Sequence, residues 1–457
     1  MAVLSRLLDR PANLLALHER CPSRYPHFLQ SAARGGRNGR YDILFAFPGE
    51  RLVLHADGRL ERPPGVSADD FFHALDQWYV AVSWPGQAPG PLPFNGGWFL
   101  FATYETAGEV EPVLRARLRP EAALPMAIAE RFPAAVIRDH ERGETWLVAE
   151  PGHEACLADM QADIAAQPEG ASPSGPRELL ESGVIEDDPE RYLAIVEQAK
   201  RYVYAGDVFQ ANLSRCWSAR VADGVNHADI YRRLCHTNPA PFAGLASWGD
   251  AAVISSSPER LVSLRGRRVD TRPIAGTRPR NSDRDNDMAL SRELMQHPKE
   301  RAEHVMLIDL ERNDLGRICE PGSVTVDEMM VLESYAHVHH IVSNVCGRVR
   351  ANVRPGDVIR AVFPGGTITG CPKVRCMEII AELEAAPRGA YTGSMGYLSR
   401  DGQMDTNILI RTLQRCGKRL EFRAGAGIVA DSEPRHELAE TRAKARGMLL
   451  ALGLGER

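Results

Sequence analysis

Short apolar runs separated by polar turns dominate the first 150 residues of this chain, and this pattern is typical of β-strands. Examples are YDILFAF, GGWFLFATYE and ETWLVAE, which are rich in aromatic and branched residues. Further along, such runs alternate with helical patterns that begin at Asp188-Pro189, at Pro298 and at Glu433. No internal repeat is present. We therefore expect an α+β fold with large, mainly antiparallel sheets.

The clearest break in composition is QPEGASPSGPR, which contains prolines, glycines and serines but no apolar periodicity. Such a segment is a linker or an exposed loop. It divides the chain into a strand-rich N-terminal region over residues 1–166, a linker over 167–187 and a main region over 188–455.

Composition excludes several classes of protein. The net charge is −5 over 457 residues with both signs mixed, so no nucleic-acid partner is expected. No uncharged apolar stretch reaches about 18 residues, so no membrane span is expected. The nine cysteines are scattered without a CxxC pair, which argues against a zinc site or a disulfide framework and predicts a cytoplasmic location.

Two Glu-x-x-Glu elements lie on predicted helices. They are Glu300 with Glu303, and Glu437 with Glu440. Three-residue spacing places both carboxylates of each pair on one helix face. Two such faces that meet would offer only oxygen ligands, which favour Mg²⁺. The alternative is two solvated acidic faces, because arginines and lysines lie nearby in the sequence.

Two stretches of small residues could approach a ligand closely. FPGGTITGCPK, which contains Thr367, superficially resembles a phosphate-binding loop, but Cys371-Pro372 stands where that motif needs lysine after the second glycine. Its backbone and hydroxyl donors could still bind a carboxylate. AGAGIVADS contains Gly425, Ala426 and Gly427. A tight turn and close strand packing are the structural alternatives.

Three polar residues lie next to apolar runs. Glu259 follows an apolar strand, where partial burial would help a carboxyl group keep its proton near neutral pH. Arg411 lies within ILIRTL and needs an anionic partner or a route to water. His340 is either functional or a core histidine with a structural hydrogen bond. For Glu259 the alternative is an ordinary turn residue.

Taken together and in order, these segments resemble the chorismate-binding enzymes. That family includes anthranilate synthase component I, aminodeoxychorismate synthase component I, isochorismate synthase and salicylate synthase. The segments are SPER, PIAGTRPR, KERAEHVMLIDLERNDLGR, VHHIVS, FPGGTITGCPKVRCMEII, GSMGY, MDTNILIRTL, AGAGIVADS and ETRAKAR. Weaker similarity reaches the N-terminal region, where Phe28-Leu29-Gln30-Ser31 resembles a tryptophan-pocket segment.

The resemblance implies a fold of two large antiparallel sheets packed face to face with helices outside. It also implies that Glu303 and Glu440 hold Mg²⁺ on chorismate, supported by Glu300 and Glu437, and that Glu259 is the general acid. Arg411 would pair with the enolpyruvyl carboxylate. The remaining pocket residues would be Thr277, His340, Thr367, Tyr391, Gly425, Ala426, Gly427 and Lys444.

The resemblance also indicates the nucleophile. Members that use water have a lysine base where this chain has Gln210, which favours ammonia. Members that use ammonia generally receive it from a glutamine amidotransferase subunit. The chain has no amidotransferase nucleophile motif, so we expect the glutaminase to be a separate partner.

Two aminations remain open. FPGGTITG, His339-His340 and GSMGY resemble aminodeoxychorismate synthase component I, which makes 4-amino-4-deoxychorismate for 4-aminobenzoate and folate. Ala275 instead resembles anthranilate synthase, which forms anthranilate and pyruvate for tryptophan synthesis; many members of the first group have a nucleophilic lysine there. We favour the first activity on the three agreeing segments and keep the second as the alternative.

Overall fold

The computed structural model describes residues 3–33, 39–84, 90–118, 120, 123–167, 178–281, 283–334 and 338–454, without the side chains of Thr277, Pro279 and Lys299. Every pairing between the described strands of its two sheets is antiparallel. This confirms the predicted α+β class with two large antiparallel sheets.

Within these described ranges, the first sheet has 12 strands. Its order is β1 (Leu4–Leu7), β9 (Glu144–Ala149), β8 (Ala134–Asp139), β3 (Tyr41–Ala46), β2 (His27–Gln30), β12 (Phe242–Trp248), β13 (Ala251–Ser257), β22 (Thr412–Cys416), β23 (Arg419–Ile428), β11 (Gln210–Arg220) and β10 (Ile185–Glu186), with β19 (Gly370–Cys371) also paired to β11.

The second sheet has 11 strands in the part of the chain that the structure describes. Its order is β16 (Ile274–Pro279), β18 (Val338–Arg348), β15 (Arg268–Thr271), β14 (Arg260–Arg265), β21 (Met404–Asn407), β20 (Ser394–Ser399), β6 (Gly97–Ala102), β7 (Ala127–Phe132), β4 (Arg51–Leu54) and β5 (Leu60–Glu61), with β17 (Thr325–Ser334) paired to β18.

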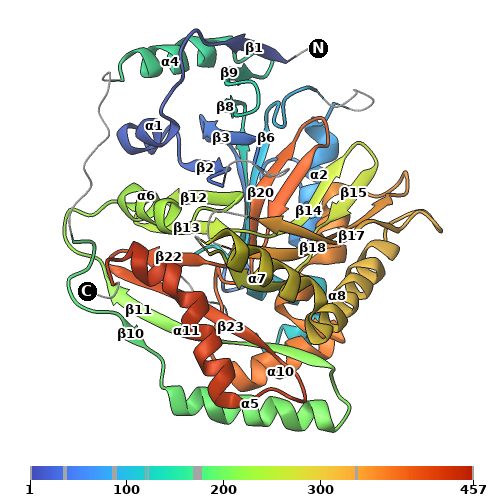
Figure 1. Cartoon of the computed structure of the whole chain (residues 1–457). Helices are drawn as coiled ribbons and strands as arrows, with labels where there is room; N and C mark the ends of the chain where they lie inside the picture. The colour runs from blue at the N-terminus through green and yellow to red at the C-terminus, as the bar shows by residue number, and fades with distance from the viewer. Residues whose placement is uncertain are drawn as a thin grey trace.

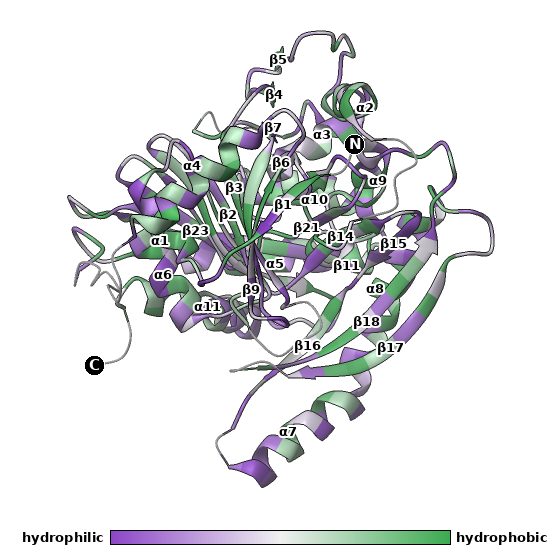
Figure 2. Ribbon diagram, turned by 90° about the horizontal axis from the view of Figure 1, so that it is seen from above, coloured by the Kyte–Doolittle hydropathy of each residue, from purple (hydrophilic) through white to green (hydrophobic). Residues whose placement is uncertain are grey.

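Both sheets mix strands from before and after the predicted linker, so residues 1–166 and 188–455 share their sheets. Within the linker, β10 pairs with β11, and residues 168–177 lie outside the described part. One apolar core contains Phe45 and Val253 of the first sheet together with Phe99 and Met395 of the second, so the sheets pack face to face. Figure 2 shows hydrophobic residues along these inner strands and a largely hydrophilic α7 at the rim.

The helices lie outside the sheets (Figure 1). They are α1 (Leu14–Arg20), α2 (Phe71–Val82), α3 (Ala107–Val110), α4 (Glu154–Ala165), α5 (Pro189–Tyr204), α6 (His227–Thr237), α7 (Arg284–Gln296), α8 (Pro298–Gly316), α9 (Pro355–Val362), α10 (Lys373–Glu384) and α11 (Pro434–Ala451), with single turns η1 (Tyr104–Thr106), η2 (Pro112–Leu114) and η3 (Gly366–Ile368). Among the described helices, none is both long and apolar enough to cross a membrane.

The predicted helix starts agree with the structure. Asp188 caps α5 by accepting from the Glu190 N–H, and Pro189 occupies the first turn. The third predicted helix, α11, begins one residue later than expected. The second, α8, begins at Pro298 as predicted and continues to Gly316.

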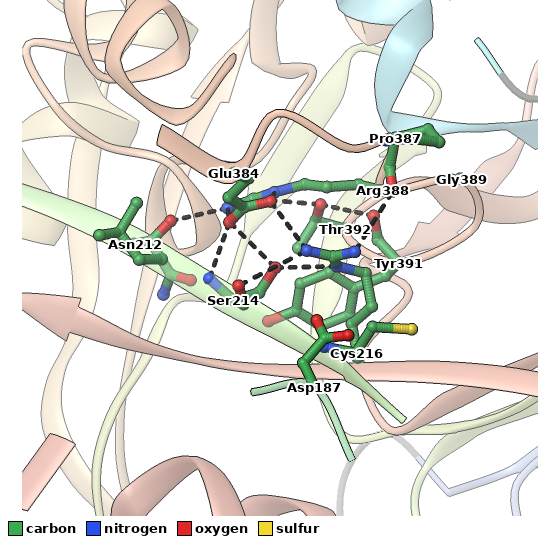
Figure 3. Close-up of polar contacts among 12 residues, drawn as sticks. Asp187, Asn212, Ser214, Cys216, Glu384, Pro387, Arg388, Gly389, Tyr391 and Thr392 are labelled. Carbon is green, nitrogen blue, oxygen red and sulfur yellow. Dashed lines mark hydrogen bonds and ion pairs between the residues drawn. The ribbon is translucent and has the colours of Figure 1, made fainter. Parts of the chain in front are cut away.

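A buried ionic network fastens α10 to the strands around it (Figure 3). Glu384 and Arg388 have side chains that are 1% exposed, and Arg388 Nη2 lies 2.6 Å from Glu384 Oε1. Arg388 also donates to the Asn212 carbonyl at 2.7 Å. Arg423 of β23 reaches the second oxygen of Glu384 at 3.2 Å, and the Ser214 N–H of β11 donates to the first at 2.7 Å. These bonds hold β11 and β23 in register beside the loop that follows α10.

We predict that Arg388→Leu lowers the free energy of unfolding by about 3–5 kcal/mol, because it leaves the Glu384 carboxylate buried without its main partner. Urea unfolding measures this change. Arg419→Leu is the control: Arg419 is 63% exposed and paired to Glu421, so it should cost no more than about 1 kcal/mol. Equal losses in the two variants would contradict the assigned role of the network.

Candidate active site

Glu259 lies where the chain passes from β13 of the first sheet to β14 of the second. The residue is 4% exposed, and its carboxyl accepts from the Ile274 N–H at 3.4 Å. Burial raises the pKa of Glu259 to about 7, although Thr367 and Ile274 act to lower it. A carboxyl with this pKa carries a proton for part of the time at neutral pH, as a general acid requires.

Arg411 lies at the return crossing, between β21 of the second sheet and β22 of the first. Its φ is 52°, a left-handed conformation that residues other than glycine rarely adopt. Burial lowers the pKa of Arg411, and Glu259 partly offsets this effect. Among the described residues, no carboxylate lies within ion-pair distance of its guanidinium. A half-buried cation of this kind is suited to bind an anionic ligand.

His340 lies on β18 opposite Thr277 of β16, and Ala275 lies opposite Ile341 in the same pair of strands. His340 is 2% exposed. Burial and the neighbouring Arg411 lower the pKa of His340 to about 3, against the effect of a hydrogen bond to the Gly276 carbonyl. The imidazole is therefore neutral at pH 7 and acts as a hydrogen-bonding group. The side chain of Thr277 lies outside the described part of the structure.

Gly425 and Gly427 face the same side of β23 and leave room for side chains of neighbouring segments. A Cβ on Gly425 would lie 2.9 Å from the Tyr391 hydroxyl, and one on Gly427 would lie 2.2 Å from Gln210 Nε2. The intervening Ala426 points the other way into the main apolar core, so only its backbone remains available to a ligand. The structure therefore brings Tyr391 and Gln210 to this face of β23.

Lys444 of α11 interacts with both β23 and Glu259. Its Nζ donates to the Gly425 carbonyl at 3.0 Å and lies 2.7 Å from Glu440 Oε1. Its charge also lowers the pKa of Glu259. Lys444, Glu259 and Arg411 thus form one electrostatic cluster, which extends through Arg411 to His340.

The predicted metal ligands lie on two helices, α8 and α11. Glu300 pairs with Arg278 at 3.2 Å and lies 2.8 Å from the position a Gly276 Cβ would occupy. On α11, Glu437 is buried, whereas the Glu440 side chain is 42% exposed. Glu303 of α8 is half-buried. Carboxylate oxygens at half-exposed positions fit Mg²⁺, which takes one or two protein carboxylates and keeps several waters.

A second acidic cluster lies elsewhere. Among the described residues, it consists of Asp270, Asp327 and Cys346, whose possible metal-ligand atoms lie within 4.8 Å of one another. Arg268 bridges its two carboxylates at 2.7 Å each, which accounts for the cluster without a metal. The four glutamates do not form such a group of three in the part of the chain that the structure describes.

The segment predicted as a tryptophan-type pocket borders a cavity of about 230 Å³ between β2 and β20–β21. Gln30 and Ser31 line it together with Tyr41, Met395 and Asp405. Gln30 accepts a hydrogen bond from the Tyr231 hydroxyl at 3.0 Å, so its side chain is oriented by the protein. Binding of tryptophan at this cavity stays a prediction.

Sequence reasoning missed a buried charged group beside the cluster, formed by Glu311, Asp314 and Lys373. Both acids are 5% exposed, and Lys373 forms an ion pair with Asp314. The available signal was helical spacing. Glu311 lies three residues after Ile308 and four before Leu315, so it had to share their buried face.

Known proteins resemble this chain over most of its length. A family model described as chorismate binding enzyme matches residues 36–450. An anthranilate synthase component I-like protein of Synechocystis sp. is 40% identical over 417 residues, which is 91% of this chain and 83% of the relative. Aminodeoxychorismate synthase component 1 of Bacillus subtilis is 38% identical over 449 residues, which is 95% of this chain and 93% of the relative.

A solved structure has the same fold. The crystal structure of anthranilate synthase component I from Streptococcus pneumoniae TIGR4 aligns with a TM-score of 0.77 at 31% identity, covering 91% of this chain and 93% of that one. The matched region extends over both sheets and includes every residue of the cluster around Glu259. The chain therefore belongs to the chorismate binding enzyme family.

Proposed function

We propose that this protein aminates chorismate with ammonia in a Mg²⁺-dependent reaction and forms 4-amino-4-deoxychorismate, as an aminodeoxychorismate synthase component I does. The observation that carries the proposal is the buried Glu259 carboxyl, whose pKa is raised to about 7 within reach of two cations. A carboxylic acid beside the 4-hydroxyl of chorismate can protonate it as the C–O bond breaks, so that it leaves as water.

Charge complementarity supports the substrate. Chorismate is a dianion, and the cluster presents Arg411 and Lys444. Arg411 binds one carboxylate of the substrate and orients the ring against Glu259. Neutral His340 donates or accepts a hydrogen bond without adding a third positive charge. Glu303 and Glu440, with Glu300 and Glu437 behind them, would hold Mg²⁺, which when bound neutralises the second carboxylate.

Gln210 supports ammonia as the nucleophile. Its amide lies against Gly427 at the position where water-using relatives have a lysine base. A side-chain amide does not accept a proton from water. Ammonia already carries a nucleophilic lone pair and needs no such base. We infer that a separate glutamine amidotransferase subunit supplies it.

Ala275 favours a second candidate, anthranilate synthase. The residue is buried in β16, where many 4-aminating relatives have a nucleophilic lysine. The two relatives with these different names are about equally similar, at 40% and 38% identity, so overall similarity does not separate the activities. The FPGGTITG, His339-His340 and GSMGY segments support 4-amination.

Glu259→Gln should remove a pH dependence of stability. The folded pKa of Glu259 is raised to about 7 from 4.5, so its proton stabilises the folded state below about pH 4.5, and this stabilisation is lost as pH rises through 7. Relative to the glutamine variant, the wild type should therefore lose about 3 kcal/mol of unfolding free energy between these pH values. Urea unfolding across that range measures the difference. A difference that does not change with pH would refute the assigned proton.

Product analysis tests the function. We expect Mg²⁺-dependent consumption of chorismate with ammonium salt at alkaline pH, and a product that a lyase converts to 4-aminobenzoate. Glu259→Gln should abolish it, since the leaving hydroxyl then lacks its acid. Fluorescent anthranilate with an equal amount of pyruvate would establish the second candidate instead. No turnover, with or without a glutaminase, would exclude both.

Glu440→Gln tests the metal. We expect Mg²⁺ affinity in the presence of chorismate to fall by at least about tenfold, because one charged oxygen ligand is lost. Isothermal titration calorimetry measures the affinity, and turnover should fall with it. Glu197→Gln, an exposed position on α5, is the matched control and should bind as the wild type does. Unchanged affinity in Glu440→Gln would contradict the ligand assignment.

A further inference from the structure

Thr392, which follows Tyr391 in the chain, has a strained backbone. Its φ is 63°, a left-handed conformation that is uncommon for residues other than glycine and a clear outlier for one branched at Cβ. The residue is 1% exposed, so this is not the relaxed conformation of a surface turn. Strain of this kind persists only where the surrounding structure imposes it, and it is concentrated at functional sites. The contacts that hold Thr392 therefore indicate what the strain achieves.

Three hydrogen bonds hold Thr392 in this conformation. Its N–H donates to the Leu409 carbonyl at 2.7 Å. Its hydroxyl accepts from Arg388 Nη1 at 3.3 Å and donates to the Tyr391 carbonyl at 2.5 Å (Figure 3). The hydroxyl thus connects the buried arginine to the backbone of the tyrosine. A serine could make the same two bonds, whereas alanine or glycine could make neither.

The next residue, Gly393, limits how the strain could be relieved. A Cβ at this position would lie 2.2 Å from the Ala102 carbonyl oxygen of β6, so the backbone is packed tightly there. The Gly393 carbonyl accepts from the Leu409 N–H at 2.9 Å. Leu409 therefore pairs with both Thr392 and Gly393. Arg411, which follows Leu409 by two residues, is also left-handed, so two strained residues lie on segments that are hydrogen-bonded to each other.

Tyr391 is fixed by the same contacts. Its N–H donates to the Arg388 carbonyl at 3.2 Å, and the Arg388 guanidinium carbon lies 5.7 Å from the centre of its ring. Its hydroxyl lies 2.9 Å from the position that a Cβ on Gly425 would occupy. Burial raises the pKa of Tyr391 to about 12, so the hydroxyl keeps its proton at neutral pH and can donate it in a hydrogen bond. A rotation of the Tyr391 backbone would displace this hydroxyl further than any other atom of the side chain.

We propose that Thr392 is a positioning residue, which Arg388 locks in a strained conformation so that the Tyr391 hydroxyl is held over Gly425 to hydrogen-bond bound chorismate. The inference rests on the proposed function, in which chorismate binds against this face of β23. The strain then lowers the stability of the chain but orients the tyrosine before the substrate arrives. Such preorganisation raises affinity because less conformational entropy is lost on binding.

Isothermal titration calorimetry with chorismate and Mg²⁺ in the absence of ammonia tests the proposal without turnover. Thr392→Gly should weaken chorismate binding by about fivefold, the loss expected when one buried hydrogen bond is no longer made well. Thr392→Ser keeps the hydroxyl and should bind chorismate as the wild type does. Unchanged affinity in Thr392→Gly, or an equal loss in Thr392→Ser, overturns the inference.

A double-mutant cycle shows whether Thr392 acts through Tyr391. Tyr391→Phe removes the hydroxyl and should itself weaken chorismate binding. In that background Thr392→Gly should weaken binding little further, because no hydroxyl remains to be oriented. A purely structural role for Thr392 predicts instead that the two losses multiply. That outcome, or wild-type affinity in Tyr391→Phe, overturns the inference.

The stability of the variants separates strain from ligand binding. Thr392→Ala loses the same hydroxyl as Thr392→Gly but keeps a Cβ at a left-handed φ, so it should unfold at a lower urea concentration than the glycine variant. Its chorismate affinity should be no lower. A chorismate affinity that falls together with the urea midpoint across the two variants overturns the inference. If Thr392→Gly does not fold, Thr392→Ala replaces it in the binding measurements.

Ala385→Gly is the matched control. Ala385 is exposed at the end of α10 and has a φ of 52°, so glycine relieves a left-handed residue there as well. The variant should unfold at a higher urea concentration than the wild type and bind chorismate unchanged. A loss of affinity equal to that of Thr392→Gly overturns the inference.

Nuclear magnetic resonance of tyrosine rings labelled with carbon-13 gives a readout without ligand. Tyr391→Phe identifies the Tyr391 signal by removing it. That signal should broaden or split in Thr392→Gly and stay as in the wild type in Thr392→Ser and Ala385→Gly. If the wild type does not bind chorismate, the proposed function fails, whereas the spectrum still decides whether Thr392 fixes the Tyr391 ring. An unchanged Tyr391 signal in Thr392→Gly overturns the inference.

Discussion

Two chain crossings between the sheets lie side by side, and the site is built on them. One crossing contains Glu259 and the other Arg411. The Ile408 N–H donates to the Glu259 carbonyl at 3.0 Å, and the Ser256 N–H donates to the Arg411 carbonyl at 3.2 Å. Neighbouring strands on either side, β13 with β22 and β14 with β21, keep the crossings aligned. The acid and the cation are thus fixed by the hydrogen bonds of both sheets at once.

This placement explains the ionisation of the groups around the crossings. Loss of water raises the pKa of Glu259 and lowers those of Arg411 and His340. Burial penalises the charged form of each group, so the acid is held partly protonated and the imidazole neutral. Arginine, whose charge persists in such surroundings, remains as the half-buried cation. An anionic ligand would add to the partial compensation that Glu259 provides to Arg411.

Local features were predictable from sequence because they depend on neighbouring residues. The proline and cap at α5 and the starts of α8 and α11 follow from helix-end chemistry. The order of the strands was not predictable, since β2 of the N-terminal region pairs with β12 of the main region across more than two hundred residues. Ala426 was assigned to the ligand side together with its glycine neighbours, but strand alternation directs its side chain into the core.

The sequence pointed to candidate site residues but not to the structure that surrounds them. An apolar run before Glu259 indicated burial, but only the crossing explains why the chain turns there. Glu311 escaped notice because it stands in a helix rich in exposed charge, and its burial depends on tertiary packing, in which η3 and β18 contact that helix. In the proposed reaction, Glu259 is the acid that the leaving group needs. Ammonia needs no base, so Gln210 has no proton to accept. A single buried acid, held near neutrality, is then enough for the C–O bond to break.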